Sequence, residues 1–495
     1  MASIAQRATD KPAFGIRADW LAAIVLALAT FATRAIWFGD PVAEFDEQLY
    51  SFIGWRMTEG DLPYVDQWDR KPFGLFAIFA LAHSLMGEGP LAYQLLACLF
   101  AFAGALLVYS LAKERVDRAS AAVAGVLYLM LMAAYGSYSG QSEIFHTPLM
   151  LAMLWLLRDW RRPDATRRAL LAMLIGGVAL QIKYTVLPQC MFFGAWALYG
   201  QWRSGRKPAQ LALLLVGFGA LGVLPTAIVA LLYAGLGHFD AFWFANFVSF
   251  FDRAPSPFGR IGGKQLIGAI PIFVLVATGL YSAFRISPPR DWRLYGLYAG
   301  WGLAALGTVL LPSTVYLYYY GALVAPSVLI GLPLIDRRGP ARFVPAALLL
   351  AGMWWILNPV DRYIHSQVER TSEARLSAAI TPYVGANLDC LYVFDGPTAL
   401  YRTTGTCLPT RYIYPDHLNN ALEASSLGVD QPVEIARILA NRPGVIVTAD
   451  IPVTFQREEN LGLIDAATSR DYRPLMSTVL HGRMITAWVR RDLAR

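Results

Sequence analysis

The chain has 495 residues, of which 56% are hydrophobic and only 16% charged, and its mean hydropathy is +0.42. Soluble domains carry about 25% charged residues, so this composition excludes an ordinary soluble enzyme and indicates a polytopic membrane protein. The net charge of +7 does not indicate a nucleic-acid partner, because Lys and Arg cluster in short loops between apolar runs. That pattern is typical of the cytoplasmic side of membrane proteins.

The N-terminal segment, residues 1–18, is basic and is predicted to be cytoplasmic. The apolar run at 19–38 is long for the apolar core of a signal peptide, and no small-residue cleavage site follows it. We therefore expect an uncleaved first span whose N-terminus lies inside the cell.

The basic loops between the later apolar runs fix one orientation, with about eleven spans, the N-terminus inside and the C-terminus outside. The predicted spans lie near 19–38, 90–112, 119–136, 146–158, 168–182, 185–201, 209–234, 265–284, 293–312, 315–335 and 341–358. The spans at 146–158, 168–182 and 185–201 are short for a bilayer, so their outer ends are expected to meet a protein-lined cavity.

The loop at 39–72, directly after the first span, holds eight acids and only three bases. Acidic groups at a membrane face are costly unless they are solvated, paired or used, so we interpret this loop as a catalytic loop. The apolar run at 73–86 is too short to cross the bilayer and predicts an interfacial helix on the outer face. The membrane domain as a whole is predicted to cover 19–358.

Residues 359–495 are more polar, and they predict a small extracytoplasmic domain of strands and helices. Strands are expected at 390–395, 412–414 and 445–448, helices at 432–440 and 460–469, and a terminal hairpin at Gly482. If this region lies outside the cytoplasm, it permits a disulfide between Cys390 and Cys407. Cys98 and Cys190 lie in apolar runs and are expected to be buried thiols.

Transfer of a group from a lipid phosphate to a hydroxyl needs a base for that hydroxyl and cations for the leaving phosphate. Asp46 is the leading candidate for the base, and in a helix it would share a face with Tyr50. The alternative is that Asp46 only caps the N-terminus of that helix. Asp69 and Lys71 precede Pro72, and Lys71 would either meet a phosphate at headgroup level or snorkel to the lipid.

Glu143 and Lys183 are two further charges in outer-face turns between short apolar runs. Charges at that depth are functional candidates, whereas the alternatives are a capping or hydrogen-bonding role for Glu143 and pairing of Lys183 with Glu143 or Asp46. Tyr319 and Tyr320 end a run of tyrosines at the start of an outer-face span. They would contact substrate or belong to an interfacial aromatic belt.

The segment FDEQLY, followed by GDLPYVDQWDRKPFG, resembles the first extracytoplasmic loop of C-type glycosyltransferases that use polyprenyl-phosphate sugars. The resemblance is to the branch of bacterial protein O-mannosyltransferases and lipid A aminoarabinose transferase. Asp46 and Glu47 match its acidic motif, and Lys71 with Pro72 matches its Lys-Pro segment, although Phe73 replaces the usual second proline.

Further along the chain, Glu143 matches the second acidic loop of that branch, and Lys183 matches a lysine of its middle helices. Tyr319 and Tyr320 precede a proline-containing span, but the histidine that often stands there in the family is missing. The segment 399–415 is similar to the C-terminal domain of many bacterial members.

The resemblance implies an inverting transfer from a polyprenyl-phosphate sugar to a glycolipid, polysaccharide, lipopolysaccharide or protein, in the bacterial inner membrane. It implies that Asp46 and Glu47, with Glu143, form the catalytic group, and that Lys71 and Lys183 bind the lipid phosphate. Some members use a divalent cation such as Mg²⁺ or Mn²⁺, for which Asp46 would be a ligand. The main alternative is a lipid or sugar transporter or flippase, although no internal repeat is found and the acids concentrate at one face. A second is a non-catalytic assembly or sensor protein.

Overall fold

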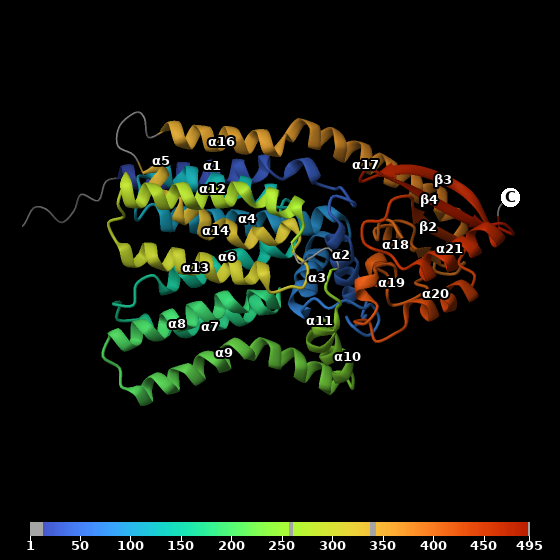
Figure 1. Ribbon diagram of the computed structural model, residues 1–495, viewed down its shortest axis with the longest axis horizontal. Helices are drawn as coiled ribbons and strands as arrows, with labels where there is room; N and C mark the ends of the chain where they lie inside the picture. Colours follow the sequence, from blue (N-terminus) through green and yellow to red (C-terminus); the bar gives the residue numbers. More distant parts are fainter. Residues whose placement is uncertain (1–12, 257–260, 337–342, 494–495) are drawn as a thin grey trace, which may run out of the picture.

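The computed structural model describes residues 13–256, 261–336 and 343–493, so most of the predicted cytoplasmic segment 1–18 lies outside the described residues. It has two parts, a long bundle of helices and a smaller mixed domain at one end of it (Figure 1). The predicted fold class, a polytopic helical membrane protein with a small C-terminal α/β domain, is confirmed.

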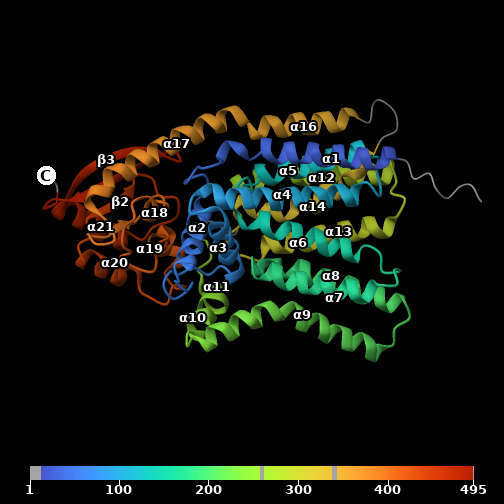
Figure 2. The same cartoon turned by 180° about the vertical axis from the view of Figure 1, so that it is seen from behind.

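The bundle helices run side by side along the long axis of the molecule (Figures 1 and 2). Each predicted span overlaps one of them. They are α1 (Ala13–Ala32), α4 (Pro90–Ala112), α5 (Arg118–Ala134), α6 (Ser142–Leu157), α7 (Ala165–Leu180), α8 (Leu187–Arg203), α9 (Pro208–Gly235), α12 (Gly263–Arg285), α13 (Trp292–Leu310), α14 (Gly321–Ile330) with its continuation α15 (Leu332–Ile335), and α16 (Phe343–Leu357). Five stretches of the described chain have the length and composition of a membrane span, and shorter apolar helices stand between them.

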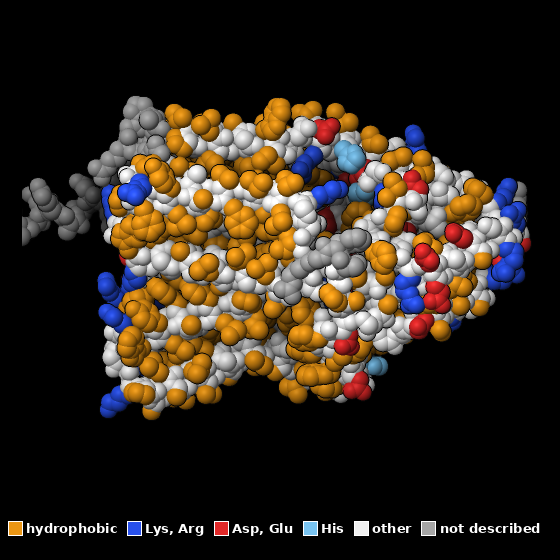
Figure 3. All heavy atoms as spheres, in the orientation of Figure 1, with side chains coloured by type: hydrophobic (Ala, Val, Ile, Leu, Met, Phe, Trp, Pro, Cys, Tyr) orange, Lys and Arg blue, Asp and Glu red, His pale blue; other side chains and the backbone are white. Residues whose placement is uncertain are grey.

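Different parts of the bundle surface carry different kinds of side chain. Hydrophobic side chains cover the flank seen in Figure 3, and Lys and Arg gather at the bundle end away from the mixed domain. The loops at that end join α4 to α5, α6 to α7, α8 to α9 and α12 to α13. They include Arg115, Arg162, Arg206 and Arg290. An apolar flank with a basic end is the surface expected of a protein held in a bilayer.

Two short helices fill the space between the bundle and the mixed domain (Figures 1 and 2). They are α2 (Phe45–Thr58) and α3 (Phe73–Met86), and α3 has the bounds expected of the interfacial helix. They pack so closely that a Cβ atom at Gly54 would lie 2.5 Å from the Cβ of Phe79, so only glycine fits there. Phe76 and Phe79 are fully buried, and α3 is thereby fixed beside the acidic loop.

Short elements follow α9 and complete this end of the bundle. They are α10 (Phe239–Trp243), the π-helical turn η3 (Phe244–Val248), and α11 (Ser249–Asp252). The 3₁₀ turns at the same end of the bundle are η1 (Ala35–Trp37), η2 (Tyr184–Val186) and η4 (Leu317–Tyr320).

The chain enters the mixed domain through α17 (Pro359–Ile380), which continues α16 after a break at Asn358 and Pro359. Asn358 has φ of 40°, and a proline cannot donate a helical hydrogen bond, so the two helices are separate. Residues 359–493 are called the α/β domain below.

The α/β domain has a four-stranded sheet in the order β1-β2-β4-β3. The strands are β1 (Leu391–Val393), β2 (Val445–Ala449), β3 (Tyr472–Leu480) and β4 (Arg483–Arg490). The β1 and β2 strands are parallel, and the other pairs are antiparallel. Its helices are α18 (Leu400–Thr403), α19 (Pro415–Asn419), α20 (Gln431–Ala440) and α21 (Glu458–Asp471), with 3₁₀ turns η6 (Thr381–Tyr383) and η7 (Ala421–Glu423).

The terminal hairpin turns at His481 and Gly482, which both have positive φ, as a two-residue hairpin turn of this kind requires. A disulfide joins Cys390 and Cys407, whose Cα atoms are 4.9 Å apart, and Cys98 and Cys190 are free. The strand predicted at 412–414 is wrong. The backbone N–H of Tyr412 donates to the side chain of Thr410 instead of to a neighbouring strand, and a proline follows at once to begin α19.

Candidate active site

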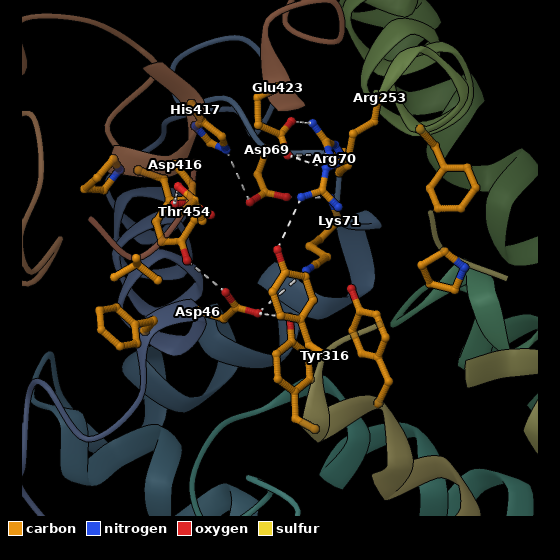
Figure 4. A pocket seen from close by; sticks show the side chains of 18 of the residues that line it. Asp46, Asp69, Arg70, Lys71, Arg253, Tyr316, Asp416, His417, Glu423 and Thr454 are labelled. Carbon is orange, nitrogen blue, oxygen red and sulfur yellow. Dashed lines mark hydrogen bonds and ion pairs between the residues drawn. The ribbon is translucent and has the colours of Figure 1, made fainter. Parts of the chain in front are cut away.

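A cavity of 380 Å³ lies where the bundle, the α2–α3 pair and the α/β domain meet. The bundle side of its wall comes from the start of α2, the loop 69–72, the turn 183–185 and the segments around 250–253 and 312–319. The α/β domain contributes 395–396, 414–417, Glu423, 453–454 and Arg483. Figure 4 shows the acidic and basic side chains that converge on this space.

Asp46 lies in the first turn of α2, but it does not cap the helix. The N-cap is Glu44, whose Oε2 accepts a 3.1 Å hydrogen bond from the backbone N–H of Glu47. The alternative assignment of Asp46 as the cap is therefore wrong, and its carboxylate is free to point into the cavity. This follows from the local pattern, since an acid at the N-cap and acids in the first turn both suit a helix N-terminus.

The Asp46 carboxylate accepts hydrogen bonds from side chains in distant parts of the chain. Tyr414 donates to Oδ1 at 3.0 Å, and Tyr318 and Tyr50 donate to Oδ2 at 3.1 and 3.2 Å. The side-chain amide of Gln141 donates to Oδ2 at 3.4 Å. Three tyrosine hydroxyls and one amide therefore hold this carboxylate in a defined orientation.

Lys71 supplies the nearest positive charge, with its Nζ 3.9 Å from Asp46 Oδ2 and 5.3 Å from the centre of the Tyr50 ring. Its backbone N–H donates to Asp69 Oδ1 at 2.7 Å, which fixes the loop before Pro72. Burial acts to raise the pKa of Asp46, but the Lys71 charge and the donated hydrogen bonds outweigh it and hold that pKa below its usual value. Asp46 is thus ionised at neutral pH.

A second charged group joins the α/β domain to two membrane-side loops. Glu423 pairs with Arg70 and with Arg253, whose Nε lies 2.7 Å from Glu423 Oε1. Burial opposes ionisation of Glu423, but the two guanidinium groups lower its pKa to about 2. One carboxylate therefore balances two cations, and this part of the wall keeps a net positive charge.

Asp416 and His417 lie on the α/β side of the cavity (Figure 4). Burial lowers the pKa of His417 to about 3, so its imidazole is neutral, and Nε2 lies 3.9 Å from Asp69 Oδ2. The Thr454 hydroxyl donates to Asp416 Oδ1 at 3.3 Å. Burial, helped by the Glu423 charge, raises the pKa of Asp416 to about 7.

Lys183 and Glu143 form a buried ion pair, so the partner of Lys183 is Glu143 and not Asp46. Lys183 stands between α7 and η2 and lines the cavity, with its Nζ 4.0 Å from the centre of the Tyr319 ring. Glu143 is in the first turn of α6 and is 1% exposed. It touches the cavity only through Lys183.

Glu47 points away from Asp46 into the protein. Its Oε1 accepts from the Tyr93 hydroxyl at 3.2 Å and its Oε2 from the backbone N–H of Gly140 at 2.6 Å, and burial raises its pKa to about 7. It ties α2 to α4 and to the turn before α6. Tyr320 is also buried, with its ring 6.3 Å from that of Tyr135.

The cavity therefore brings together some of the residues singled out in the sequence and leaves others behind its wall. The residues that line it are Asp46, Asp69, Lys71, Lys183 and Tyr319. Those that lie behind it are Glu47, Tyr50, Glu143 and Tyr320. Tyr50 still reaches Asp46 by its hydroxyl.

The donor set around Asp46 does not fit a divalent cation. Both carboxylate oxygens accept phenolic hydrogen bonds, and an ammonium group stands 3.9 Å away where a second metal ligand would be needed. Within the described ranges, no group of three or more His, Cys, Asp or Glu side chains could hold a metal ion.

Several residues of the site were not found from the sequence, and Tyr414, Asp416 and Glu423 are the ones that matter most to its chemistry. These three belong to the α/β domain and reach the cavity only through tertiary packing. The single sequence signal was the resemblance of the segment 399–415 to a family domain, which contains Tyr414 but does not give it a role.

Comparisons with known proteins agree with this architecture. The family model described as dolichyl-phosphate-mannose-protein mannosyltransferase matches residues 70–229, and no curated protein sequence matches the chain. The crystal structure of ArnT from Cupriavidus metallidurans in the apo state aligns with a TM-score of 0.66 and 15% identity, over 97% of this chain and 99% of that chain. The same protein bound to undecaprenyl phosphate aligns with a TM-score of 0.63 at the same identity and coverage. The chain thus has the same fold as this ArnT structure.

Proposed function

We propose that this protein is a membrane glycosyltransferase that moves a sugar from a polyprenyl-phosphate donor to a hydroxyl group of an envelope acceptor. The acceptor is a glycolipid, polysaccharide, lipopolysaccharide or protein. The observation that carries the proposal is Asp46, an ionised carboxylate held in a cavity at the end of an apolar bundle, 3.9 Å from the Lys71 ammonium. A base and a cation side by side are what sugar transfer from a phosphate requires.

The bundle side of the cavity suits the lipid phosphate. Lys71, Lys183 and Arg253 all line it, and Glu423 balances only one of the two guanidinium charges that it pairs with. Cationic side chains near headgroup level attract anionic lipid groups. The solved ArnT structure with undecaprenyl phosphate supports a polyprenyl phosphate as the lipid carrier here too.

The reaction is a single displacement. The acceptor hydroxyl gives its proton to the Asp46 carboxylate as its oxygen bonds to the anomeric carbon of the donor sugar. The bond from that carbon to the phosphate oxygen breaks on the opposite face, and its electron pair leaves with the lipid phosphate. Attack and departure on opposite faces invert the anomeric centre. Lys71 offsets the charge that develops on the phosphate.

The incoming hydroxyl can donate to Asp46 Oδ1, which accepts only the Tyr414 hydroxyl and therefore has a free acceptor position. On Oδ2, the Gln141 amide makes the longest of the donated hydrogen bonds, 3.4 Å, and is the group most readily replaced there. The tyrosines then keep the carboxylate oriented during proton transfer. A positioned base contributes about 10²–10⁴-fold to such a step.

The charge distribution supports an orientation in the bacterial inner membrane. The basic end of the bundle would face the cytoplasm with the N-terminus, and the cavity with the α/β domain would face the periplasm. The Cys390–Cys407 disulfide is compatible with that assignment, since disulfides persist in oxidising compartments.

The test uses the full-length protein in lipid nanodiscs, a panel of synthetic undecaprenyl-phosphate sugars and an envelope extract as the acceptor. Asp46→Asn should reduce transfer by about 10²–10⁴-fold while binding undecaprenyl phosphate like the wild type. Glu59→Gln is the matched control, because Glu59 is exposed at the other end of α2.

Transfer by Asp46→Asn at the wild-type rate would overturn the role of Asp46. Movement of the lipid across vesicles without a new glycosidic bond would overturn the transferase assignment in favour of a flippase.

A further inference from the structure

The carboxylates of the cavity differ in how their charge is balanced. Asp46 has Lys71 and several hydroxyls, Asp395 has Arg483 at 2.7 Å, and Glu423 has two arginines. Asp416 makes no ion pair with any residue in the described parts of the chain, and a single hydroxyl, that of Thr454, donates to it at 3.3 Å. A carboxylate oxygen accepts up to two hydrogen bonds, so Asp416 has most of its capacity unused.

The place of Asp416 in the fold is fixed by its neighbour. It lies in the first turn of α19, which begins at Pro415, and Tyr414 immediately before that helix is bonded to Asp46. The Tyr414–Asp46 contact therefore sets where Asp416 stands relative to the proposed base. In Figure 4, Asp416 and Thr454 lie on the α/β side of the pocket and Lys71 lies across from them.

The two walls of the cavity have different chemistry. A sugar donor on a lipid carrier enters from the bilayer, beside the bundle, where Lys71 and Lys183 line the cavity and can bind its phosphate. The acceptor must then approach Asp46 from the other side, along the wall that the α/β domain provides. Among the carboxylates of the described chain that line this wall, Asp416 has the fewest donors.

We propose that Asp416, supported by Thr454, is the acceptor-positioning residue, and that its carboxylate accepts a hydrogen bond from a hydroxyl or amino group of the acceptor. The bound acceptor would then present its reacting hydroxyl to Asp46. This inference rests on the proposed transferase function. Asp416 is half-buried and lines the cavity, so a ligand that brings a hydrogen-bond donor to its carboxylate gains affinity at this point.

The charged surroundings of Asp416 should make the affinity for the acceptor depend on pH. Burial and the neighbouring Glu423, Asp46 and Asp395 charges raise its pKa, Arg253 acts in the opposite direction, and the result is about 7. Below that pH the group is protonated and loses acceptor capacity. The affinity for the acceptor should therefore increase as the pH rises through about 7.

The experiment measures transfer by the full-length protein in nanodiscs, with the envelope extract titrated as the acceptor. Asp416→Asn should raise the apparent KM for the extract at least tenfold, leave the KM for the lipid donor unchanged and lose the pH inflection near 7. Thr454→Val should raise the same KM by a smaller factor. Asp465→Asn is the matched control, because Asp465 is exposed on α21 of the same domain.

Binding of undecaprenyl phosphate checks that each variant is folded. If Asp416→Asn does not bind this lipid, the KM of Thr454→Val for the extract is used to test the inference instead. Acetylation of the amines in the extract shows which group of the acceptor donates to Asp416. If transfer is lost, the donor is an amino group, and if transfer persists, the donor is a hydroxyl. An unchanged KM for the extract, or a raised KM for the lipid donor, would overturn the inference while the transferase function stands. Absence of transfer by the wild type with every donor would overturn both.

Discussion

The hydroxyl of Tyr414 donates a 3.0 Å hydrogen bond to Asp46, a residue 368 positions earlier in the chain. Asp46 belongs to a helix packed on the membrane bundle, and Tyr414 belongs to the α/β domain. The domain that follows the last span is therefore part of the site and not an appendage to it. Its removal would leave the proposed base without one of its donors.

Tyr414→Phe should weaken the enzyme mainly at low pH. The phenol stabilises the ionised carboxylate, so its loss raises the pKa of Asp46 and the carboxylate is protonated at a higher pH than in the wild type. We expect kcat/KM to fall about tenfold on the acid side of the profile and less at alkaline pH. Tyr363→Phe, at an exposed tyrosine of α17, should leave the profile unchanged. A profile identical to the wild type in Tyr414→Phe would contradict this.

The Glu143–Lys183 pair should prove important for stability, because both side chains are buried. Lys183→Met or Glu143→Gln alone should cost about 3–5 kcal/mol of unfolding free energy, and the double variant should cost less than the sum. Thermal unfolding in detergent measures this. The control is Arg56→Gln, which breaks the more exposed pair with Asp61 and should cost about 1 kcal/mol or less.

Activity of the same double variant separates the two roles of Lys183. If Lys183 binds the lipid phosphate, the double variant should be stable but should bind undecaprenyl phosphate more weakly than the wild type. Wild-type binding would limit Lys183 to a structural role.

A fall in pH should weaken the packing of the α/β domain on the bundle, because Glu423 becomes protonated. The folded pKa of about 2 lies below the ordinary value of 4.5, so its contribution is present above about pH 4.5 and is lost as the pH falls toward 2. The loss should amount to about 3 kcal/mol. In Glu423→Gln, stability should be lower at pH 7 and should lack this acid-dependent part, as measured by thermal unfolding across that range. An unchanged acid dependence in Glu423→Gln would show that other carboxylates dominate.

Reduction of the Cys390–Cys407 bond should lower the stability of the α/β domain by about 3 kcal/mol, since it closes a loop with a sequence separation of 17. Unfolding of Cys390→Ser/Cys407→Ser, compared with the wild type with and without reductant, measures the loss. A maleimide-polymer gel shift on membranes dissolved in denaturing detergent should find two reactive thiols before reduction and four after it. Four thiols before reduction would place the domain in a reducing compartment.

Much of the bundle was predictable, because periodicity and loop charge are local properties of the chain. The helix at 73–86 shows this well: the short apolar run and the proline before it predicted its bounds. The strand expected at 412–414 failed for the opposite reason. Its backbone bonds depend on Thr410 and on the fold around Pro415, which alternation of apolar residues does not encode.

The site was only partly predictable. Asp46 and Lys71 stood out because charges beside a membrane span are rare, but the same argument could not tell which face of α2 meets the cavity. Glu47 is one position further along the helix and points into the protein instead. Among consecutive tyrosines, the sequence favoured Tyr319 and Tyr320, yet the hydroxyl that reaches Asp46 belongs to Tyr318.

Synthesis proceeds from the N-terminus, so Asp46 and Lys71 are in place long before the ribosome reaches Tyr414 and Glu423. A half-made chain already inserted in the membrane lacks the α/β side of the cavity and the Glu423 carboxylate that pairs with Arg70 and Arg253. The proposed transferase therefore acquires a complete site only after the α/β domain has been made and has folded against the bundle.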